Sequence, residues 1–248
     1  MKQQLVLAFL VFVAVVVICP NAHAQDGTEI QVETQVQIQE DQVTGFYVGG
    51  HLGANTADSE VNGGTLATDE DTFIGFGGVL GYDFGYFRVD GELALRFNTI
   101  DRLGGISLNP PSVWKGDPST TKALSYMVNG YFDLPTDGPL SFYAGAGIGF
   151  ATVSIDWKAP GVFFSHVPVA DDNDSGLAYQ FSGGIGYEID FDREINPITI
   201  VVTLGYRYFA TEELQMMFAS SSPINPGSPF TIEYQSHEFL IGARVLFH

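Results

Sequence analysis

Between Phe87 and Asn98 the chain alternates without interruption between two kinds of side chain. One set consists of Phe87, Val89, Gly91, Leu93, Leu95 and Phe97, and the other of Arg88, Asp90, Glu92, Ala94, Arg96 and Asn98. A period of two indicates a β-strand with two different faces, and about twelve residues is twice the ordinary strand length in soluble proteins. Strands of this length cross a bilayer in β-barrels, with the apolar face toward lipid. The segment therefore favours a membrane-spanning strand.

The same pattern recurs and predicts an all-β fold, a closed antiparallel transmembrane β-barrel of eight strands. The expected strands are Thr44–Asn55, Thr72–Phe84, Tyr86–Ile100, Lys122–Leu134, Leu140–Trp157, Leu177–Asp190, Ile198–Thr211 and Thr231–Phe247. After residue 24, the chain has no continuous apolar run near 18 residues, the length that a membrane-spanning helix needs.

The connections between these strands alternate in length. Those at 84–86, 135–139 and 191–197 are short, and those near 56–71, 101–121, 158–176 and 212–230 are long and polar. Outer-membrane barrels have short periplasmic turns and long outer loops. The alternation therefore predicts four outer loops and places both ends of the barrel in the periplasm.

Aromatic residues recur in pairs on the predicted outward face. The pairs are Phe87 with Phe97, Phe142 with Phe150, Tyr179 with Tyr187, and Phe239 with Phe247. A separation of 8 or 10 residues along a tilted strand spans roughly 20–25 Å of the membrane normal, close to the apolar band of an outer-membrane barrel. We interpret the pairs as two aromatic girdles.

The N-terminus predicts export. Lys2 precedes an apolar run from Leu5 to Ile18, and Ala22-His23-Ala24 has the small-x-small pattern of a signal-peptidase site. We expect residues 1–24 to be a signal peptide, 25–43 an acidic flexible periplasmic lead-in, and 44–248 an outer-membrane β-barrel. The expected location is the outer membrane of a Gram-negative bacterium.

The chain is strongly acidic, with a formal net charge of −19. A phosphate backbone would be repelled, which argues against nucleic acid as a partner. Cys19, the only cysteine, lies in the signal segment, so thiolate metal sites and disulfides are excluded from the mature chain. We expect no cofactor and no metal.

Four segments resemble landmarks of the small, OmpA-like outer-membrane β-barrel family, whose members are often described as porin-family surface antigens. They are Gly45-Phe46-Tyr47-Val48-Gly49-Gly50, Met127-Val128-Asn129-Gly130-Tyr131-Phe132-Asp133, Gly145-Ala146-Gly147-Ile148-Gly149 and Leu204-Gly205-Tyr206-Arg207-Tyr208-Phe209. They fall in the first, fourth, fifth and seventh expected strands. The resemblance thus covers nearly the whole mature chain.

The C-terminus resembles the assembly signal of that family, which the barrel-assembly machinery reads. Gly242, Val245 and Phe247 match its pattern, whereas Leu240 replaces a polar residue and His248 follows the aromatic one. The resemblance implies this machinery as a partner.

Charged residues on the predicted inward face are the candidate site. They are Asp83, Arg88, Asp90, Glu92, Arg96, Asp133, Glu188, Arg207, Glu238 and Arg244. An eight-stranded barrel is only wide enough for its own side chains, and buried charges must be paired. We favour an ion-pair network that closes the lumen. A narrow polar pore is the main alternative, and acid–base catalysis by Asp90 and Glu92 is the weakest.

No other group of residues indicates an enzyme. His51, His166, His237 and His248 lie in no nucleophile motif, and we interpret His51 as a satisfied interior histidine. The loop clusters Asp69–Asp71 and Asp171–Gly176 are acidic, and the second matches the opening of a calcium loop but has Ser182 where the final glutamate belongs. We interpret both clusters as solvated charge.

The predicted function is structural. We expect a protein that contributes to envelope integrity, contacts outer-membrane lipid and lipopolysaccharide, and presents its outer loops to a surface ligand that the sequence does not name. Two alternatives remain open, a narrow porin-like channel for small solutes and an exported soluble ligand-binding barrel.

Overall fold

The structure is a computed structural model, and it describes residues 44–62, 66–71, 73–103, 106–107, 119–160, 166–190, 198–223 and 225–247. All of these residues belong to one compact unit, Asp41–His248. The predicted signal peptide, the acidic lead-in and His248 lie outside the described residues. Within the described part, no helix is long and apolar enough to cross a membrane.

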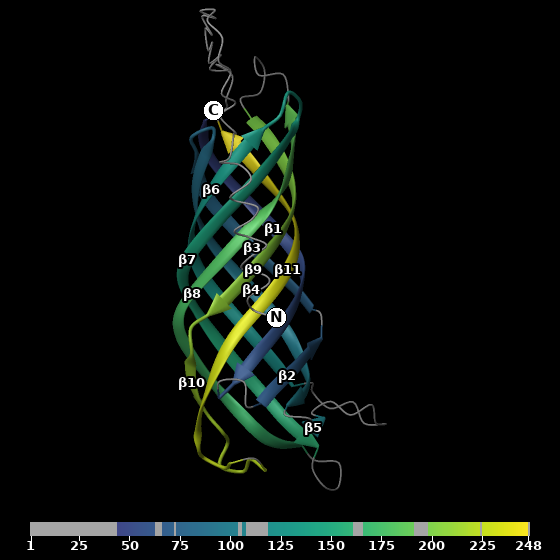
Figure 1. Cartoon of the computed structure of the whole chain (residues 1–248), viewed down its shortest axis with the longest axis vertical. Helices are drawn as coiled ribbons and strands as arrows, with labels where there is room; N and C mark the ends of the chain where they lie inside the picture. The colour runs from purple at the N-terminus through teal and green to yellow at the C-terminus, as the bar shows by residue number, and fades with distance from the viewer. Residues whose placement is uncertain are drawn as a thin grey trace, which may run out of the picture. The chain divides into compact units, whose positions relative to one another are not determined.

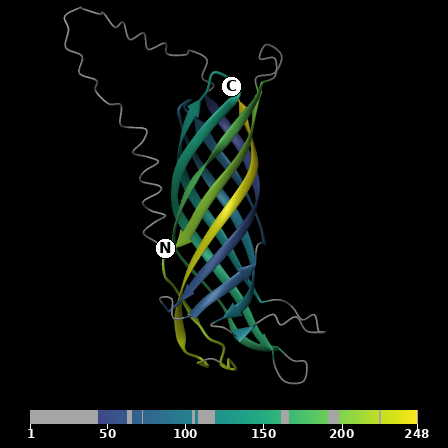
Figure 2. The same cartoon turned by 45° about the vertical axis from the view of Figure 1, so that its right-hand side comes forward.

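Eight long strands form a closed ring. They are β1 (Gly45–Val61), β3 (Phe73–Asp83), β4 (Phe87–Leu103), β6 (Thr120–Pro135), β7 (Leu140–Pro160), β8 (His166–Asp190), β9 (Ile198–Thr211) and β11 (Pro229–Phe247). Each pairs antiparallel with the next along the chain, and β11 pairs with β1 from Phe247↔Phe46 to Ile232↔Val61. Figures 1 and 2 show these strands as one tilted wall. The predicted eight-stranded antiparallel barrel is confirmed.

Three short strands lie outside the ring order. β2 (Leu66–Asp71) pairs with β1 and β4, β5 (Ile106–Ser107) pairs with β4, and β10 (Leu214–Met217) pairs with β11. All three fall in segments that the sequence assigns to outer loops. They add backbone hydrogen bonds to that end of the barrel.

The strands extend beyond their predicted outer ends, which corrects the predicted loops. β1 continues to Val61, β7 continues to Pro160, and β8 begins at His166 rather than Leu177. Most of the supposed loop at 158–176 is therefore paired wall, with register from Lys158↔Pro168 to Ala151↔Gly176. The prediction was wrong there because residues 171–175 are a run of polar residues without apolar alternation, and Pro168 disfavours the interior of a strand.

The two ends of β7 have opposite patterns. From Leu140 to Phe150 the exposed outward side chains are apolar, and glycines occupy the inward positions 145, 147 and 149. From Ala151 to Ala159 the buried inward residues are apolar, and Thr152, Ser154, Asp156 and Lys158 face outward. The periplasmic part of β7 thus has the pattern of a barrel in lipid. The outer part has the pattern of a water-soluble barrel with an apolar core.

Glycines allow two close approaches that shape the barrel. Gly85 has a φ of 96°, a left-handed conformation that suits glycine, and it forms the tight turn between β3 and β4. Gly184 on β8 lies against the Tyr143 hydroxyl. A Cβ at this position would be only 2.7 Å from that oxygen. Missing side chains on the inward face therefore make room for large aromatic neighbours.

Candidate functional site

The lumen of the barrel contains the charged residues selected from the sequence. Nine of them are buried side chains from β3, β4, β6, β9 and β11, namely Asp83, Arg88, Asp90, Glu92, Arg96, Asp133, Arg207, Glu238 and Arg244. Glu188 lies half-buried on the inward face of β8, near the turn after β6. Strand alternation explains their placement, since each lies one residue from an outward neighbour.

The periplasmic end of the lumen holds two arginine pairs. Arg88 Nε donates to Asp133 Oδ2 at 2.8 Å, and the Arg88 guanidinium lies 4.0 Å from the centre of the Tyr131 ring. Arg244 Nη2 lies 3.8 Å from Asp83 Oδ2, a longer contact. Asp83 also accepts a hydrogen bond from the Gly85 backbone N–H at 2.8 Å. These contacts fasten the lower ends of four strands to one another.

The middle of the lumen holds the most enclosed pairs. Arg207 forms two parallel hydrogen bonds with Glu92, at 2.8 and 3.0 Å, and its Nη1 lies 3.6 Å from Glu238 Oε2. Arg96 Nε bonds to Glu238, and Arg96 Nη1 donates to Ser125 Oγ at 2.7 Å. A bidentate arginine–carboxylate pair is among the stronger charge-assisted interactions in proteins. Since β4 and β9 are not neighbours in the ring, Arg207 and Glu92 connect separated parts of the wall.

Uncharged side chains complete this layer, and the sequence did not single them out. Asp90 accepts hydrogen bonds from the Tyr47 hydroxyl at 2.6 Å and from Asn129 Nδ2 at 2.8 Å. Gln180 Nε2 in turn donates to Asn129 Oδ1 at 2.7 Å. The donors to Asp90 are thus neutral, whereas Glu92 accepts hydrogen bonds from the Arg207 guanidinium as well as from the Asn129 and Gln180 amides. Inward position on a predicted strand was the available signal for these residues.

His51 and His237, the histidines whose side chains the structure describes, lie on opposite faces of the wall. His51 Nε2 lies in the lumen 3.5 Å from Arg207 Nη1 and 3.9 Å from Glu92 Oε1. His237 lies on the other face of the wall, with Nδ1 2.5 Å from the Tyr206 hydroxyl. Among the described residues, no three His, Cys, Asp or Glu side chains are grouped to hold a metal ion.

Between the charged layer and the outer end of the barrel, the lumen becomes apolar. The transition contains polar contacts such as Asn55 Nδ2 to Asn98 Oδ1 at 2.7 Å and Trp157 Nε1 to Thr121 Oγ1 at 3.2 Å. Beyond it lies a buried cluster that we call the outer core, which includes Ile100, Val153, Ile155, Trp157, Val169, Phe209, Leu214, Met216, Phe218, Phe230 and Ile232. Phe230 stacks on Phe218 with centroids 4.3 Å apart. The sequence analysis missed this core because its residues fall mostly in predicted loops or at strand ends.

The lumen therefore contains two filled layers, one charged and one apolar. A cavity of about 70 Å³ lies in the charged layer, among Tyr47, His51, Arg88, Arg207 and Arg244. A space of this size holds about two water molecules. The arrangement can pair charges and fasten strands together, but it offers little room for a solute.

Comparison with known proteins decides the family. The model of the outer membrane protein beta-barrel domain matches residues 11–245, which is most of the chain. The chain belongs to this family. The resemblance to small OmpA-like barrels, stated from four sequence segments, is confirmed, and the barrel is one of the outer membrane.

Individual proteins are similar to this outer-membrane barrel over different lengths. An uncharacterized protein of Brucella abortus (strain 2308) is 33% identical over 97 residues, covering 37% of this chain and 31% of that protein. The chain thus spans about a third of the length of the curated relatives it matches. Solved structures include Neisserial surface protein A, with 17% identity, 83% and 99% coverage of the two chains and a TM-score of 0.48. OprG from Pseudomonas aeruginosa has 14% identity, 81% and 95% coverage, and a TM-score of 0.48.

The aromatic residues of the predicted girdles lie on the outward face of this outer-membrane barrel. Phe87, Phe142, Phe150, Tyr179, Tyr187, Phe239 and Phe247 are exposed, and Phe97 is half-buried beside Phe76. Near the periplasmic end, Phe46 and Tyr82 have ring centroids 5.0 Å apart. Near the outer end, Tyr206 contacts Phe239, with centroids 5.6 Å apart. Aromatic clusters at both ends of the apolar band are the arrangement expected at lipid–water boundaries.

The residues of the predicted C-terminal assembly signal lie where the ring closes. Gly242, Val245 and Phe247 of β11 pair with His51, Val48 and Phe46 of β1. Recognition by the assembly machinery stays a prediction from the sequence.

The acidic run at Asp171–Gly176 lies in β8 and not in a loop, which corrects its assignment. Asp174 Oδ2 accepts a hydrogen bond from the Gln215 backbone N–H at 2.8 Å, and Asp172 Oδ2 accepts one from Met217 at 2.9 Å. Both donors belong to β10, whose other edge pairs with β11. The two carboxylates therefore bind the N–H groups of an edge strand.

Proposed function

We propose that this protein is a structural outer-membrane barrel with a closed lumen, which strengthens the envelope and presents a rigid outer extension of its wall. The single observation that carries the proposal is the double filling of the lumen. Charged pairs fill it in the membrane part, and the outer core fills it beyond.

The charged layer supports closure because its members bind one another across the barrel. Arg207 of β9 holds Glu92 of β4, and Arg96 of β4 holds Glu238 of β11. Arg96 and Arg207 are 1% and 3% exposed. An ion entering this layer would have to break ion pairs that are already formed, which is costly in a low-dielectric interior.

The outer core supports closure by a different mechanism. Trp157 and Ile232 are fully buried in it, and Trp157 packs against Phe230 with ring centroids 6.0 Å apart. An apolar constriction excludes water and therefore the hydrated ions that water carries. A solute would have to cross both layers in series.

Planar-bilayer recording tests the proposal against the narrow-channel alternative. We expect the purified wild-type protein to give no discrete conductance steps. The variant with Trp157→Ala and Phe230→Ala loosens the outer core alone, and it stays silent because the charged layer still closes the lumen. Discrete steps from the wild type, larger in the variant, would overturn the closed-lumen proposal and establish a channel. Heat-dependent mobility in electrophoresis verifies that both proteins are folded barrels.

A further inference from the structure

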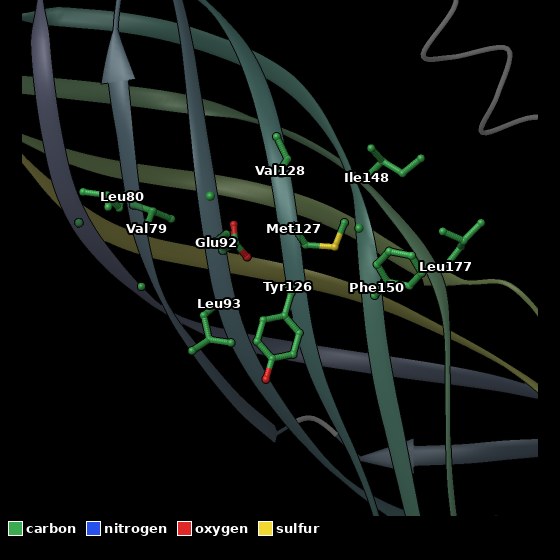
Figure 3. Close-up of a pocket in the computed structure, with 14 residues that line it drawn as sticks. Val79, Leu80, Glu92, Leu93, Tyr126, Met127, Val128, Ile148, Phe150 and Leu177 are labelled. Atoms are coloured by element: carbon green, nitrogen blue, oxygen red, sulfur yellow. The ribbon is translucent and has the colours of Figure 1, made fainter.

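A shallow apolar groove crosses the outward wall of the barrel (Figure 3). It has a volume of about 940 Å³ and spans β3, β4, β6 and β7, with Gly49 of β1 at one end and Leu177 of β8 at the other. Its outward rim includes Leu80, Leu93, Tyr126, Val128, Ile148 and Phe150, all of them exposed. The groove lies on the exposed apolar face of these strands, with Tyr126 and Phe150 toward its outer end.

Two outward glycines give the groove its depth. Gly78 and Gly91 both line it and are both exposed. A Cβ at Gly78 would have its nearest neighbour 3.8 Å away, and one at Gly91 would have it 4.0 Å away. Larger residues would therefore fit these positions without a clash. Packing within the protein does not require glycine here, and the space above the two residues is free for another molecule.

The chemistry of the groove selects a hydrocarbon. Its outward side chains are apolar apart from the Tyr126 phenol. Glu92 also lines the groove, but its side chain is 0% exposed and is bonded to Arg207 on the lumen side. A flexible acyl chain matches a shallow apolar channel in the wall of a membrane protein, since it adds contact without bringing in a polar group.

A lysine lies on the outer side of the groove, at the outer boundary of the apolar band. Lys122 shares the outward face of β6 with Tyr126, about 13 Å further along the strand. It pairs with Phe97 on one side and with Ser154 on the other, where the outward pattern has become polar. Lys122 is exposed, and within the described part of the chain its ammonium group has no hydrogen bond or ion pair. Lys158, in contrast, pairs with Asp156 at 2.9 Å.

We propose that the groove and Lys122 together bind lipid A, the phosphorylated and multiply acylated anchor of lipopolysaccharide. One acyl chain lies over Gly78 and Gly91, and a phosphate contacts the Lys122 ammonium. A chain with a net charge of −19 repels anionic headgroups in general, so an exposed cation on the outer side of an acyl-sized groove selects where one binds. The proposal goes beyond the structural role and does not depend on whether the lumen conducts.

Native mass spectrometry of the full barrel in detergent, titrated with bisphosphorylated lipid A, tests the proposal. We expect Lys122→Gln to weaken binding about fivefold, the effect of one lysine near an anionic lipid headgroup. The double variant Gly78→Leu with Gly91→Leu fills the groove and abolishes retention of the lipid. Lys158→Gln is the matched charge control, because that lysine is already paired. Gly183→Leu is the matched filling control on β8, where a Cβ makes an ordinary 3.5 Å contact.

Two further lipids separate the roles of charge and chain. Dephosphorylated lipid A should bind the wild type as weakly as bisphosphorylated lipid A binds the Lys122 variant. Phosphatidylethanolamine should bind weakly and show no dependence on Lys122. Equal retention of lipid A by the wild type, the lysine variant and the filled-groove variant, with all three folded, would overturn the site. So would equal losses in the control variants.

Discussion

The periplasmic and outer parts of strand β7 share one backbone geometry but have opposite side-chain polarity on their two faces. In the periplasmic part of the strand, Phe142, Ile148 and Phe150 point out of the barrel. In the outer part, Ile155 and Trp157 point into the lumen. Hydrogen bonding is continuous through both parts, from Pro135↔Ser141 to Thr120↔Asp156 on the β6 side. The wall therefore does not change where the polarity reverses, and the surrounding medium is what differs.

The reversal teaches where the bilayer ends. In lipid the apolar side chains belong outside, and in water they belong inside, so the crossover marks the outer boundary of the apolar band. β11 shows the same change, with exposed Phe239 outside and buried Glu238 inside, followed toward the outer end by buried Tyr234 and Ile232. Strands from separate parts of the ring thus agree on the position of the boundary.

The largest expected effect on the free energy of unfolding comes from breaking an ion pair in the charged layer of the lumen. Glu92→Ala leaves Arg207 buried without its bidentate partner, and loss of one partner of a buried pair costs about 3–5 kcal/mol. Urea unfolding in lipid vesicles, followed by tryptophan fluorescence, measures the free energy of unfolding. The double variant Glu92→Leu with Arg207→Leu should recover most of the loss, because it leaves no unpaired charge. A double variant as unstable as the single one would mean that packing, and not charge, dominates this layer.

An arginine on each side of the crossover sharpens the comparison. Ile148→Arg places a charge on the lipid face and should lower the free energy of unfolding by about 2 kcal/mol. Ser154→Arg lies six residues further on the same face of β7, beyond the crossover, and should change it by less than about 0.5 kcal/mol. The same urea titration measures both. Equal losses of unfolding free energy in the two variants would place the boundary of the apolar band on the outer side of Ser154. That result would contradict the assignment of the outer part to water.

The smallest effect concerns the acidic residues of the outer part. Asp172→Ala removes the acceptor for the Met217 N–H, worth about 1 kcal/mol, so exchange of that amide with solvent should speed up about fivefold. Hydrogen–deuterium exchange measures this locally. Asp171→Ala is the control, because Asp171 is exposed and faces away from β10. Similar acceleration in both variants would show that net charge, and not the hydrogen bond, protects the edge.

Much of the fold could be predicted from the alternation of residues alone. The bounds of β9, Ile198–Thr211, coincide with the prediction, because Asn196-Pro197 precedes it, the charged pair Glu212-Glu213 follows it, and its outward face is apolar. The outer extensions could not be predicted in the same way. In the segment 158–176, Pro168 and four acidic or amide residues outweighed Val169 and Ala170, which gain meaning as core residues only when the opposite strands are in place.

The site was predictable as a set of inward charges and not as a set of pairs. Alternation places Arg207 and Glu92 inside, but they lie 115 positions apart, and only the register of four intervening pairings brings them together. Asn129 and Gln180 were missed because a neutral amide on an inward position has no distinguishing pattern. The groove could not be predicted, since it needs Gly78 and Gly91 on adjacent strands.

The paired outer wall has a consequence for immune recognition. Lys122 and Ser154 are distant in sequence and adjacent on the outer surface, held together by the β6–β7 ladder. An antibody that covers this area contacts side chains from several strands at once, so its epitope is discontinuous. A linear peptide copied from any one segment would not reproduce it, and an immunogen for this surface has to keep the barrel folded.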